Sequence, residues 1–335
     1  MEGLQEKILS LLPLPRREVL NQRSYRLDPQ IRFFLKISGF FKQVHENKSV
    51  EQARRSFAFF SNQRFGSSKN GVEVRDFFIE GSKRKISVRL YLPPGFGPKS
   101  AVFMFMHGGG WVLGNLDSHD LVCKKLALGT KHAILAIDYA LAPESPFPIA
   151  LYEGLEAYQW LRKHRDSLLG FSTPIVFCGD SAGGNLVSAL CLLCKQQSIE
   201  QPSYQILFYP VTDLLSESST RNEFANGYLL SRETMTWFEK NYAANEDLRN
   251  PLVSPIYAKD FSGIAPAKIF LAGFDILFAE GQSYARKLEQ QGVSVDVHVI
   301  ERQIHSFANL SGLIPSASED FEFCIQKIAQ IKLGG

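Results

Sequence analysis

The chain has 335 residues, enough for one large α/β domain or two modest domains. Its hydrophobic fraction of 45% is ordinary for a soluble globular protein. The net charge of +3, with no basic cluster interleaved with aromatic residues, gives no support for a nucleic-acid-binding protein.

The sequence also argues against membrane and secretory classes. No stretch approaches the ~18 uninterrupted apolar residues of a membrane helix, so we expect no stable membrane insertion. Acidic residues and prolines interrupt the first 20 residues, which is unlike a signal peptide, and a cytoplasmic location is expected. Five scattered cysteines do not predict a disulfide framework. Cys191 and Cys194 have redox spacing, but they lie in an apolar stretch that predicts core packing.

The first 70 residues predict helices that precede the sheet. Asp28 can cap a helix that Pro29 opens, and residues 31–37 supply its apolar side. A second helix is predicted over residues 50–60. Because these helices are rich in phenylalanine, we expect residues 1–70 to form cap helices.

From residue 71 the pattern changes to strands. Residues 72–79 and 86–92 flank Gly81-Ser82 and predict a hairpin-like pair. Residues 101–106 are apolar without alternation, which is typical of a central parallel strand buried on both faces.

Strands and helices then alternate, which predicts an α/β fold with a mostly parallel central sheet and helices on both faces. The predicted strands are 133–137, 174–178, 204–209, 267–271 and 293–300, and the predicted helices are 118–128, 148–164, 182–194, 277–290 and 315–332. We expect residues 71–212 and 250–335 to form this core.

Residues 213–249 interrupt the alternation of strands and helices, because this segment is too long for a strand-to-helix loop. We expect this aromatic segment to be a cap insertion over the strand ends, where α/β sheets bind ligands. A helical insertion with a purely structural role is the alternative.

The segment Gly179-Asp180-Ser181-Ala182-Gly183 lies between a predicted strand and a predicted helix. A tight turn there strains the serine backbone and requires small neighbours, which the segment provides. We therefore expect Ser181 to be a nucleophile; the alternative is a glycine-rich turn with a spectator serine.

Residues 107–110, His-Gly-Gly-Gly, follow a strand end beside that turn. Uncovered backbone N–H groups stabilise a developing oxyanion by roughly 2.7–4 kcal/mol per donor. The N–H groups of Gly109, Gly110 and Ala182 are the predicted oxyanion hole. His107 is expected to order the loop rather than to titrate. A flexible glycine loop is the alternative.

Of the seven histidines, His305 is the predicted base, because it follows the 293–300 strand by a short loop. His298 lies inside that strand and is interpreted as part of a polar strand face. We expect the remaining four outside the oxyanion loop at the surface: His45, His119, His132 and His164.

The base needs a carboxylate that fixes its tautomer. Asp275 follows the 267–271 strand and gives the chain order serine, acid, histidine. Glu280 is the second candidate, although it should lie inside the next helix. Asp180 adjoins the nucleophile and is expected to point elsewhere.

Together these segments resemble the hormone-sensitive-lipase-like esterases, the bacterial family IV of the α/β-hydrolase fold. They run in the family's order from about residue 86 to 310, and Leu27-Asp28-Pro29 also resembles the family. The matching segments are residues 107–112, 138–139, 141–144, 147–148, 179–185, 209–210, Asp275 with Leu277, and His305-x-Phe307. The resemblance implies an α/β-hydrolase core with a helical cap.

Three positions depart from the family pattern. Ala140 stands where the family usually has arginine, so an internal salt bridge is expected to be missing. Ile276 and Ala279 replace the usual proline and aspartate near the acid, and Ala279 removes a charge that could anchor this loop.

The expected function is that of a serine carboxylesterase. The resemblance implies short- to medium-chain acyl or aryl esters as substrates. An apolar acyl pocket or the core of the cap would account for the aromatic residues Phe33, Phe34, Phe40, Phe41, Trp237 and Phe238. One alternative is an amidase or deacetylase with the same triad. The other is a ligand-binding relative without turnover. His305 argues against this ligand-binding alternative, because the gibberellin receptors, non-catalytic relatives in this fold, have lost the histidine.

No metal or organic cofactor is expected, because no cysteine or histidine cluster has ligand spacing. The expected partner is a small-molecule ester, with no nucleic acid, and a homodimer is compatible with the sequence.

Overall fold

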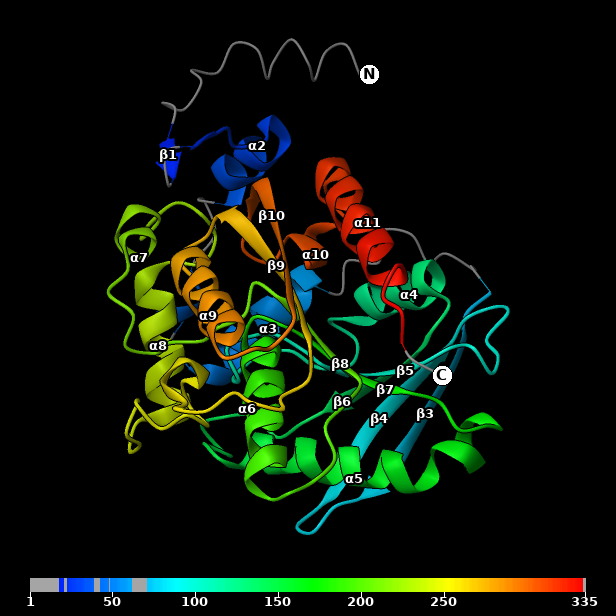
Figure 1. Cartoon of the computed structure of the whole chain (residues 1–335). Coiled ribbons are helices and arrows are strands. Elements are labelled where there is room, and N and C mark those ends of the chain that lie inside the picture. The colour runs from blue at the N-terminus through cyan, green and yellow to red at the C-terminus, as the bar shows by residue number, and fades with distance from the viewer. Residues whose placement is uncertain (1–17, 21–22, 39–42, 48, 62–70, 334–335) are drawn as a thin grey trace.

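The computed structural model describes residues 18–20, 23–38, 43–47, 49–61 and 71–333. An eight-stranded sheet forms its centre (Figure 1). From one edge to the other, the strands are β10 (Val295–Ile304), β9 (Ala267–Phe274), β8 (Tyr204–Phe208), β7 (Ile175–Asp180), β5 (Val102–Met106), β6 (Ala133–Asp138), β4 (Lys85–Leu92) and β3 (Glu73–Glu80). Neighbours from β10 to β6 are parallel, whereas β4 is antiparallel to both β6 and β3. The predicted mostly parallel sheet is confirmed.

Helices cover both faces of the sheet. α4 (Asp120–Thr130) and α11 (Pro315–Ala329) pack together on one face. α5 (Ile149–Leu169), α6 (Ala182–Gln196) and α9 (Phe278–Gln290) cover the other, where η2 (Pro255–Tyr257) contacts both α6 and α9. This arrangement buries the sheet on both sides, as its apolar strands predict.

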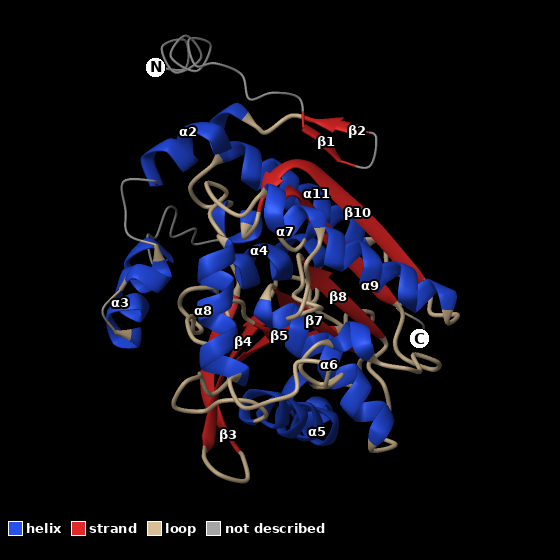
Figure 2. Cartoon of the chain, turned by 90° about the vertical axis from the view of Figure 1, so that its left-hand side faces the viewer, coloured by secondary structure: helices blue, strands red, loops and turns tan. Residues whose placement is uncertain are grey.

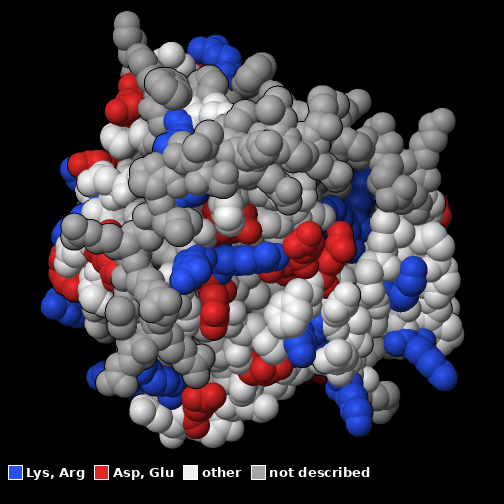
Figure 3. Space-filling view, turned by 90° about the horizontal axis from the view of Figure 1, so that it is seen from above, with Lys and Arg blue, Asp and Glu red and all other residues white. Residues whose placement is uncertain are grey.

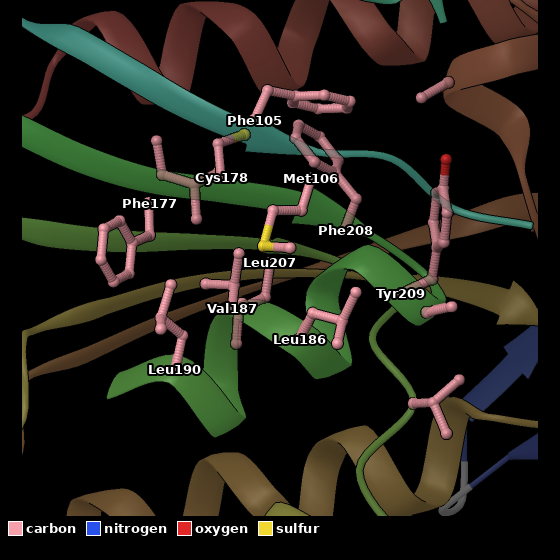
Figure 4. Packing of buried hydrophobic residues seen from close by; sticks show 14 of the residues in the cluster. Phe105, Met106, Phe177, Cys178, Leu186, Val187, Leu190, Leu207, Phe208 and Tyr209 are labelled. Carbon is pink, nitrogen blue, oxygen red and sulfur yellow. The ribbon is translucent and has the colours of Figure 1, made fainter. Parts of the chain in front are cut away.

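The core lies between the central strands and α6. Every residue of β5 and β7 is buried. Figure 4 shows Leu186, Val187 and Leu190 of α6 pointing toward Met106 and Leu207 of the sheet. Burial of each such aliphatic side chain contributes about 1.5–3 kcal/mol, so these contacts fix α6 on the sheet.

Two strands are longer than expected. β9 continues to Phe274, and β10 continues to Ile304 after a register shift that follows Ile300. Asp275 and His305 therefore follow their strands directly. Because β7, β9 and β10 run parallel, their carboxyl ends lie together at one end of the sheet. Ser181, Asp275 and His305 follow these carboxyl ends.

The described part of residues 1–70 contains more than helices. β1 (Glu18–Leu20) and β2 (Arg23–Tyr25) form an antiparallel ribbon that the sequence did not predict. α2 (Pro29–Ser38), the 3₁₀ helix η1 (Val44–Glu46) and α3 (Val50–Ser61) follow it. Asp28 Oδ1 accepts hydrogen bonds from the N–H of Gln30 at 2.8 Å and of Ile31 at 3.3 Å, so its predicted capping role is confirmed.

The 213–249 segment contains α7 (Ser219–Glu223) and α8 (Arg232–Ala243). Ser231 caps α8, because its Oγ accepts a hydrogen bond from the N–H of Thr234 at 3.1 Å. α3 and α8 both contact η1, and all three lie on the same side of the molecule as Figure 2 shows it. His45 of η1 joins the two segments through a 2.8 Å contact between its Nδ1 and Thr234 Oγ1.

Among the described helices, none combines the length and apolarity needed to span a membrane. Seen from above, acidic and basic side chains of the described residues lie intermingled rather than gathered into one broad area of a single sign (Figure 3).

Candidate active site

Ser181 occupies the turn between β7 and α6. Its backbone is strained, with φ of 54° and ψ of −118°. The two glycines of the turn are required by close backbone contacts. A Cβ at Gly179 would lie 2.5 Å from the carbonyl of Gly183, and one at Gly183 would lie 1.9 Å from Met106 O. The turn therefore presents Ser181 at the edge of the sheet.

The structure brings the three predicted catalytic residues together. His305 Nε2 lies 2.9 Å from Ser181 Oγ, and His305 Nδ1 lies 2.7 Å from Asp275 Oδ2. Because a carboxylate oxygen only accepts, Nδ1 carries the proton in this pair, which leaves Nε2 free to accept from the serine hydroxyl. The exposed fractions of Ser181, His305 and Asp275 are 7%, 4% and 1%, so the chain of contacts is shielded from water.

The loop that carries Asp275 is held by polar contacts despite the departures at Ile276 and Ala279. Asp275 Oδ1 accepts a hydrogen bond from the N–H of Leu277 at 3.0 Å. Thr220 of α7 donates to Ile276 O at 3.2 Å and accepts from the N–H of Ala279 at 3.2 Å. Thr220 thus links this loop to the 213–249 segment, a contact that the sequence did not reveal.

Glu280, the second candidate for the acid, has a different place. It lies inside α9, and its Oε1 accepts from the N–H groups of Thr212 at 2.8 Å and Asp213 at 3.2 Å. Burial raises the pKa of Glu280 to about 8, although the hydrogen bonds from these two N–H groups act to lower it. Glu280 therefore anchors the segment after β8 to α9, away from the contacts that His305 makes.

The oxyanion loop follows β5. Gly109 has φ of 113° and Gly110 has φ of 61°, a region that favours glycine. A Cβ at Gly109 would lie 2.3 Å from Leu113 O. Among the described residues, none accepts a hydrogen bond from the N–H groups of Gly109, Gly110 or Ala182, whereas that of Gly108 is taken by Asp180. These three N–H groups can serve an oxyanion.

His107 is buried and orders the loop. Its Nδ1 lies 2.8 Å from Gly108 O, and its ring stacks on Tyr139 with centroids 4.3 Å apart. The Tyr139 hydroxyl donates to His107 O at 2.6 Å. Burial lowers the pKa of His107 to about 3, so its neutral ring donates to the loop carbonyl at ordinary pH.

The expectation that His119 lies at the surface is wrong. Only 2% of this residue is exposed, because its ring lies against Phe105 of β5 and against His107, with centroids 6.1 and 5.4 Å away. Its Nε2 lies 3.3 Å from Asp180 Oδ1. The polar neighbours on both sides of His119 gave no signal of this burial. His45, His132 and His164 are half-buried rather than exposed.

His298 lies on β10, half-buried, as part of the strand. Its ring stacks on Phe270 with centroids 5.4 Å apart, and its Nε2 lies 3.1 Å from Asp296 Oδ2. These contacts agree with the interpretation of His298 as part of a polar strand face.

Aromatic residues of α8 cover the oxyanion loop. A Cβ at Gly110 would lie 2.2 Å from the ring of Phe238, so this ring rests directly on the glycine. Trp237 packs on Phe238 with centroids 5.4 Å apart. Of the other predicted pocket residues, Phe33 is 44% exposed and Phe34 is partly buried. Phe40 and Phe41 lie outside the described residues.

Arg54 of α3 also contacts this region, which the sequence did not reveal. Its Nε donates to Val112 O and one terminal nitrogen donates to Ala142 O, both at 2.9 Å. The same guanidinium contacts both carboxylate oxygens of Glu144. Arg54 therefore fixes α3 to the segments that follow the oxyanion loop and β6.

Ala140 has no charged side chain, so position 140 makes no salt bridge, as expected, but another ion pair lies beside it. Arg84 donates to the buried carboxylate of Glu153 at 2.6 and 2.8 Å, and the N–H of Ala140 donates to the same carboxylate at 2.6 Å. The arginine comes from the turn between β3 and β4 instead of position 140.

All five cysteines are buried and free. Cys191 and Cys194 lie on α6, so their spacing reflects core packing. Within the described ranges, no group of three or more His, Cys, Asp or Glu side chains is arranged to hold a metal ion.

Comparison with known proteins agrees with this geometry. A family described as "alpha/beta hydrolase fold" matches residues 103–309. The chain is 34% identical to carboxylic ester hydrolase LipN of Mycobacterium tuberculosis (91% of this chain, 84% of LipN). It is 36% identical to ethyl acetate hydrolase of Pseudomonas putida (84% and 90%). A solved α/β-hydrolase from the metagenome of Lake Arreo, Spain, superposes with a TM-score of 0.85 at 30% identity (90% and 98%).

Proposed function

Because this chain belongs to the α/β-hydrolase fold family, in its hormone-sensitive-lipase-like branch, and is a carboxylic ester hydrolase, we propose that Ser181, His305 and Asp275 are its catalytic triad. The observation that carries this proposal is the continuous chain of contacts from Asp275 through His305 to Ser181. Each contact is within hydrogen-bond distance, and all three side chains are buried.

In the proposed reaction, His305 Nε2 takes the proton of Ser181 as its Oγ attacks the ester carbonyl carbon. Asp275 holds the ring through Nδ1 and stabilises the imidazolium that forms. His305 then gives the proton to the leaving alcohol, and the acyl group stays on Ser181. Water, activated by His305 in the same way, releases the acid and restores the serine.

The N–H groups of Gly109, Gly110 and Ala182 stabilise the negative oxygen of each tetrahedral intermediate. Each such donor contributes about 2.7–4 kcal/mol of transition-state stabilisation. Their lack of other acceptors among the described residues supports this role. The start of α6 adds the positive end of its dipole beneath the same oxygen.

The substrates are short- to medium-chain acyl or aryl esters. The buried serine and the position of Phe238 on Gly110 support a small apolar site. The name of the ethyl acetate hydrolase relative points to a short acyl group in that protein, which supports the same class here. We further propose that residues 1–70 and 213–249 act as the cap, because Phe238 rests on the oxyanion loop and Arg54 binds Val112, just after this loop.

A chain-length series of p-nitrophenyl esters from C2 to C16, measured on the wild type and Ser181→Ala, tests this proposal. We expect the butyrate to turn over much faster than the C16 ester, and Ser181→Ala to lose turnover and fluorophosphonate labelling. Ser188→Ala, which removes another buried hydroxyl from α6, is the matched control and should keep both. Labelling that survives in Ser181→Ala would refute the nucleophile, and faster cleavage of anilides than of esters would identify an amidase.

A further inference from the structure

The carboxylate of Asp180, next to Ser181 in the chain, has no part in the proposed triad. Only 1% of this residue is exposed. Burial alone would raise the pKa of Asp180, but its contacts with His119 and with the N–H of Gly108 lower it. A buried carboxylate is costly unless it is paired, so its partners define what it does.

One oxygen of Asp180 holds the oxyanion loop. Oδ1 accepts a hydrogen bond from the N–H of Gly108 at 2.8 Å, and both groups are buried. Gly108 immediately precedes the two glycines whose N–H groups are proposed to bind the oxyanion. A Cβ at Gly108 would lie 2.5 Å from Asp180 Oδ2, so the loop and the carboxylate are in direct contact.

The other oxygen holds the segment that follows the catalytic histidine. Oδ2 accepts from Asn309 Nδ2 at 3.2 Å. Asn309 belongs to α10 (Phe307–Leu310), which starts two residues after His305. Asp180 is itself the last residue of β7, so one side chain joins the segments that carry the nucleophile, the oxyanion donors and the base.

We propose that Asp180 is a positioning residue for ester hydrolysis, whose carboxylate fixes the oxyanion loop and the histidine-bearing segment relative to Ser181. This inference rests on the proposed function. His119, 3.3 Å from Oδ1, faces the same carboxylate from α4, and His107 lies beside His119 with ring centroids 5.4 Å apart.

Replacement by alanine tests the positioning role. In Asp180→Ala, the N–H of Gly108 and the amide of Asn309 lose their common acceptor. Because a displacement of about 1 Å can cost about 100-fold in rate, we expect kcat to fall about 10- to 100-fold while KM stays within about threefold. A kcat within about threefold of the wild type would overturn the proposal.

Asp180→Asn separates geometry from charge. Its amide oxygen can still accept from Gly108, and its NH₂ can donate to Asn309 Oδ1, which has no other partner among the described residues. We expect kcat within about fivefold of the wild type, and a loss as large as in Asp180→Ala would overturn the proposal.

A swap of the two polar side chains remains informative if Asp180→Ala fails to fold. Asn309→Asp sets a half-buried carboxylate against the buried carboxylate of Asp180, and kcat should fall at least about tenfold. Asp180→Asn/Asn309→Asp restores one donor and one acceptor, and kcat should recover to within about fivefold of the wild type. No recovery in the double variant would overturn the proposed contact.

Lys268→Met is the matched control for loss of a buried charge. Lys268 is the second residue of β9, so it lies at the opposite end of this strand from Asp275. It is buried and pairs with Asp296. Its kcat should be unchanged. Ser181→Ala belongs in the same assay. If Ser181→Ala keeps its activity, the proposed function is refuted. If Ser181→Ala loses its activity but Asp180→Ala is fully active, only the positioning role is refuted. Circular dichroism reports the folded fraction of every variant, and end-point fluorophosphonate incorporation reports it for the variants that keep Ser181.

Discussion

The indole of Trp111 lies flat against the phenol ring of Tyr242, with centroids 4.4 Å apart and planes 4° apart. Trp111 directly follows Gly110, one of the proposed oxyanion-hole residues, and Tyr242 lies near the end of α8. One turn earlier on α8, Phe238 rests on Gly110 itself. The oxyanion loop is therefore held between the sheet and α8, so the 213–249 segment belongs to the structure of the site as well as to its cover.

We predict that Tyr242→Ala lowers kcat about tenfold and reduces the free energy of unfolding by about 3 kcal/mol, because the loop loses its aromatic support. Urea unfolding and ester kinetics measure the two effects. Tyr242→Phe keeps the stacked ring, and its lost hydroxyl has no hydrogen-bond partner among the described residues. This control should match the wild type, and equal losses in both variants would contradict the role given to stacking.

Asp275→Asn is expected to reduce kcat by about 10³- to 10⁴-fold with little change in KM. An amide that presents its NH₂ to His305 Nδ1 favours the tautomer with the proton on Nε2, which cannot accept from Ser181. Steady-state kinetics on p-nitrophenyl butyrate give the ratio. Asp166→Asn removes an exposed carboxylate from α5 and should have no effect. A loss below tenfold in Asp275→Asn would show that this aspartate is not the orienting acid.

Gly183→Ala should prevent folding to the active state, because its Cβ would lie 1.9 Å from Met106 O in the backbone of β5. Overpacking against a side chain can be relieved, but two packed backbones cannot separate here without moving β5 from α6. Soluble yield, thermal melting and activity are the measurements. Gly97→Ala meets only one atom, at 3.9 Å, and should behave as the wild type. Normal activity in Gly183→Ala would contradict the close approach of α6 to β5.

Stability should depend on pH through Glu280. Burial raises the pKa of Glu280 from 4.5 to about 8. Between pH 4.5 and pH 8, Glu280 keeps a proton in the folded chain that it has released in the unfolded chain. The free energy of unfolding therefore falls as pH rises from about 4.5 to about 8. The fall is at most about 1.4 kcal/mol per pH unit. Glu280→Gln cannot ionise and should gain stability relative to the wild type over this range.

Urea unfolding of both proteins at pH 5, 6, 7 and 8 checks this expectation. A constant difference between Glu280→Gln and the wild type across these values would contradict it. Glu289→Gln, an exposed position on α9, is the control for loss of a glutamate from this helix.

The core and the meeting of Ser181, Asp275 and His305 could be predicted because their signals are local. Apolar strands such as β5 and β7 identify a parallel sheet, and parallel strands bring Ser181, Asp275 and His305 to one edge wherever their loops begin. Small residues around Ser181 mark the turn, because only they fit between two backbones.

The remaining features depend on contacts between distant segments. The burial of His119 follows from its contacts with Phe105 and His107, which its neighbours in the sequence do not reveal. Arg84 reaches Glu153 from a turn 69 positions away, so inspection of position 140 alone did not reveal this ion pair. The β1–β2 ribbon is three residues per strand, too short for a pattern of alternation to stand out.

The five buried thiols have a practical consequence. A cysteine introduced at an exposed position, such as Glu233 on α8, would be the one thiol that a maleimide fluorophore meets in the folded enzyme. A dye attached there would show whether the surroundings of α8 change during turnover, and the native cysteines would not have to be replaced first.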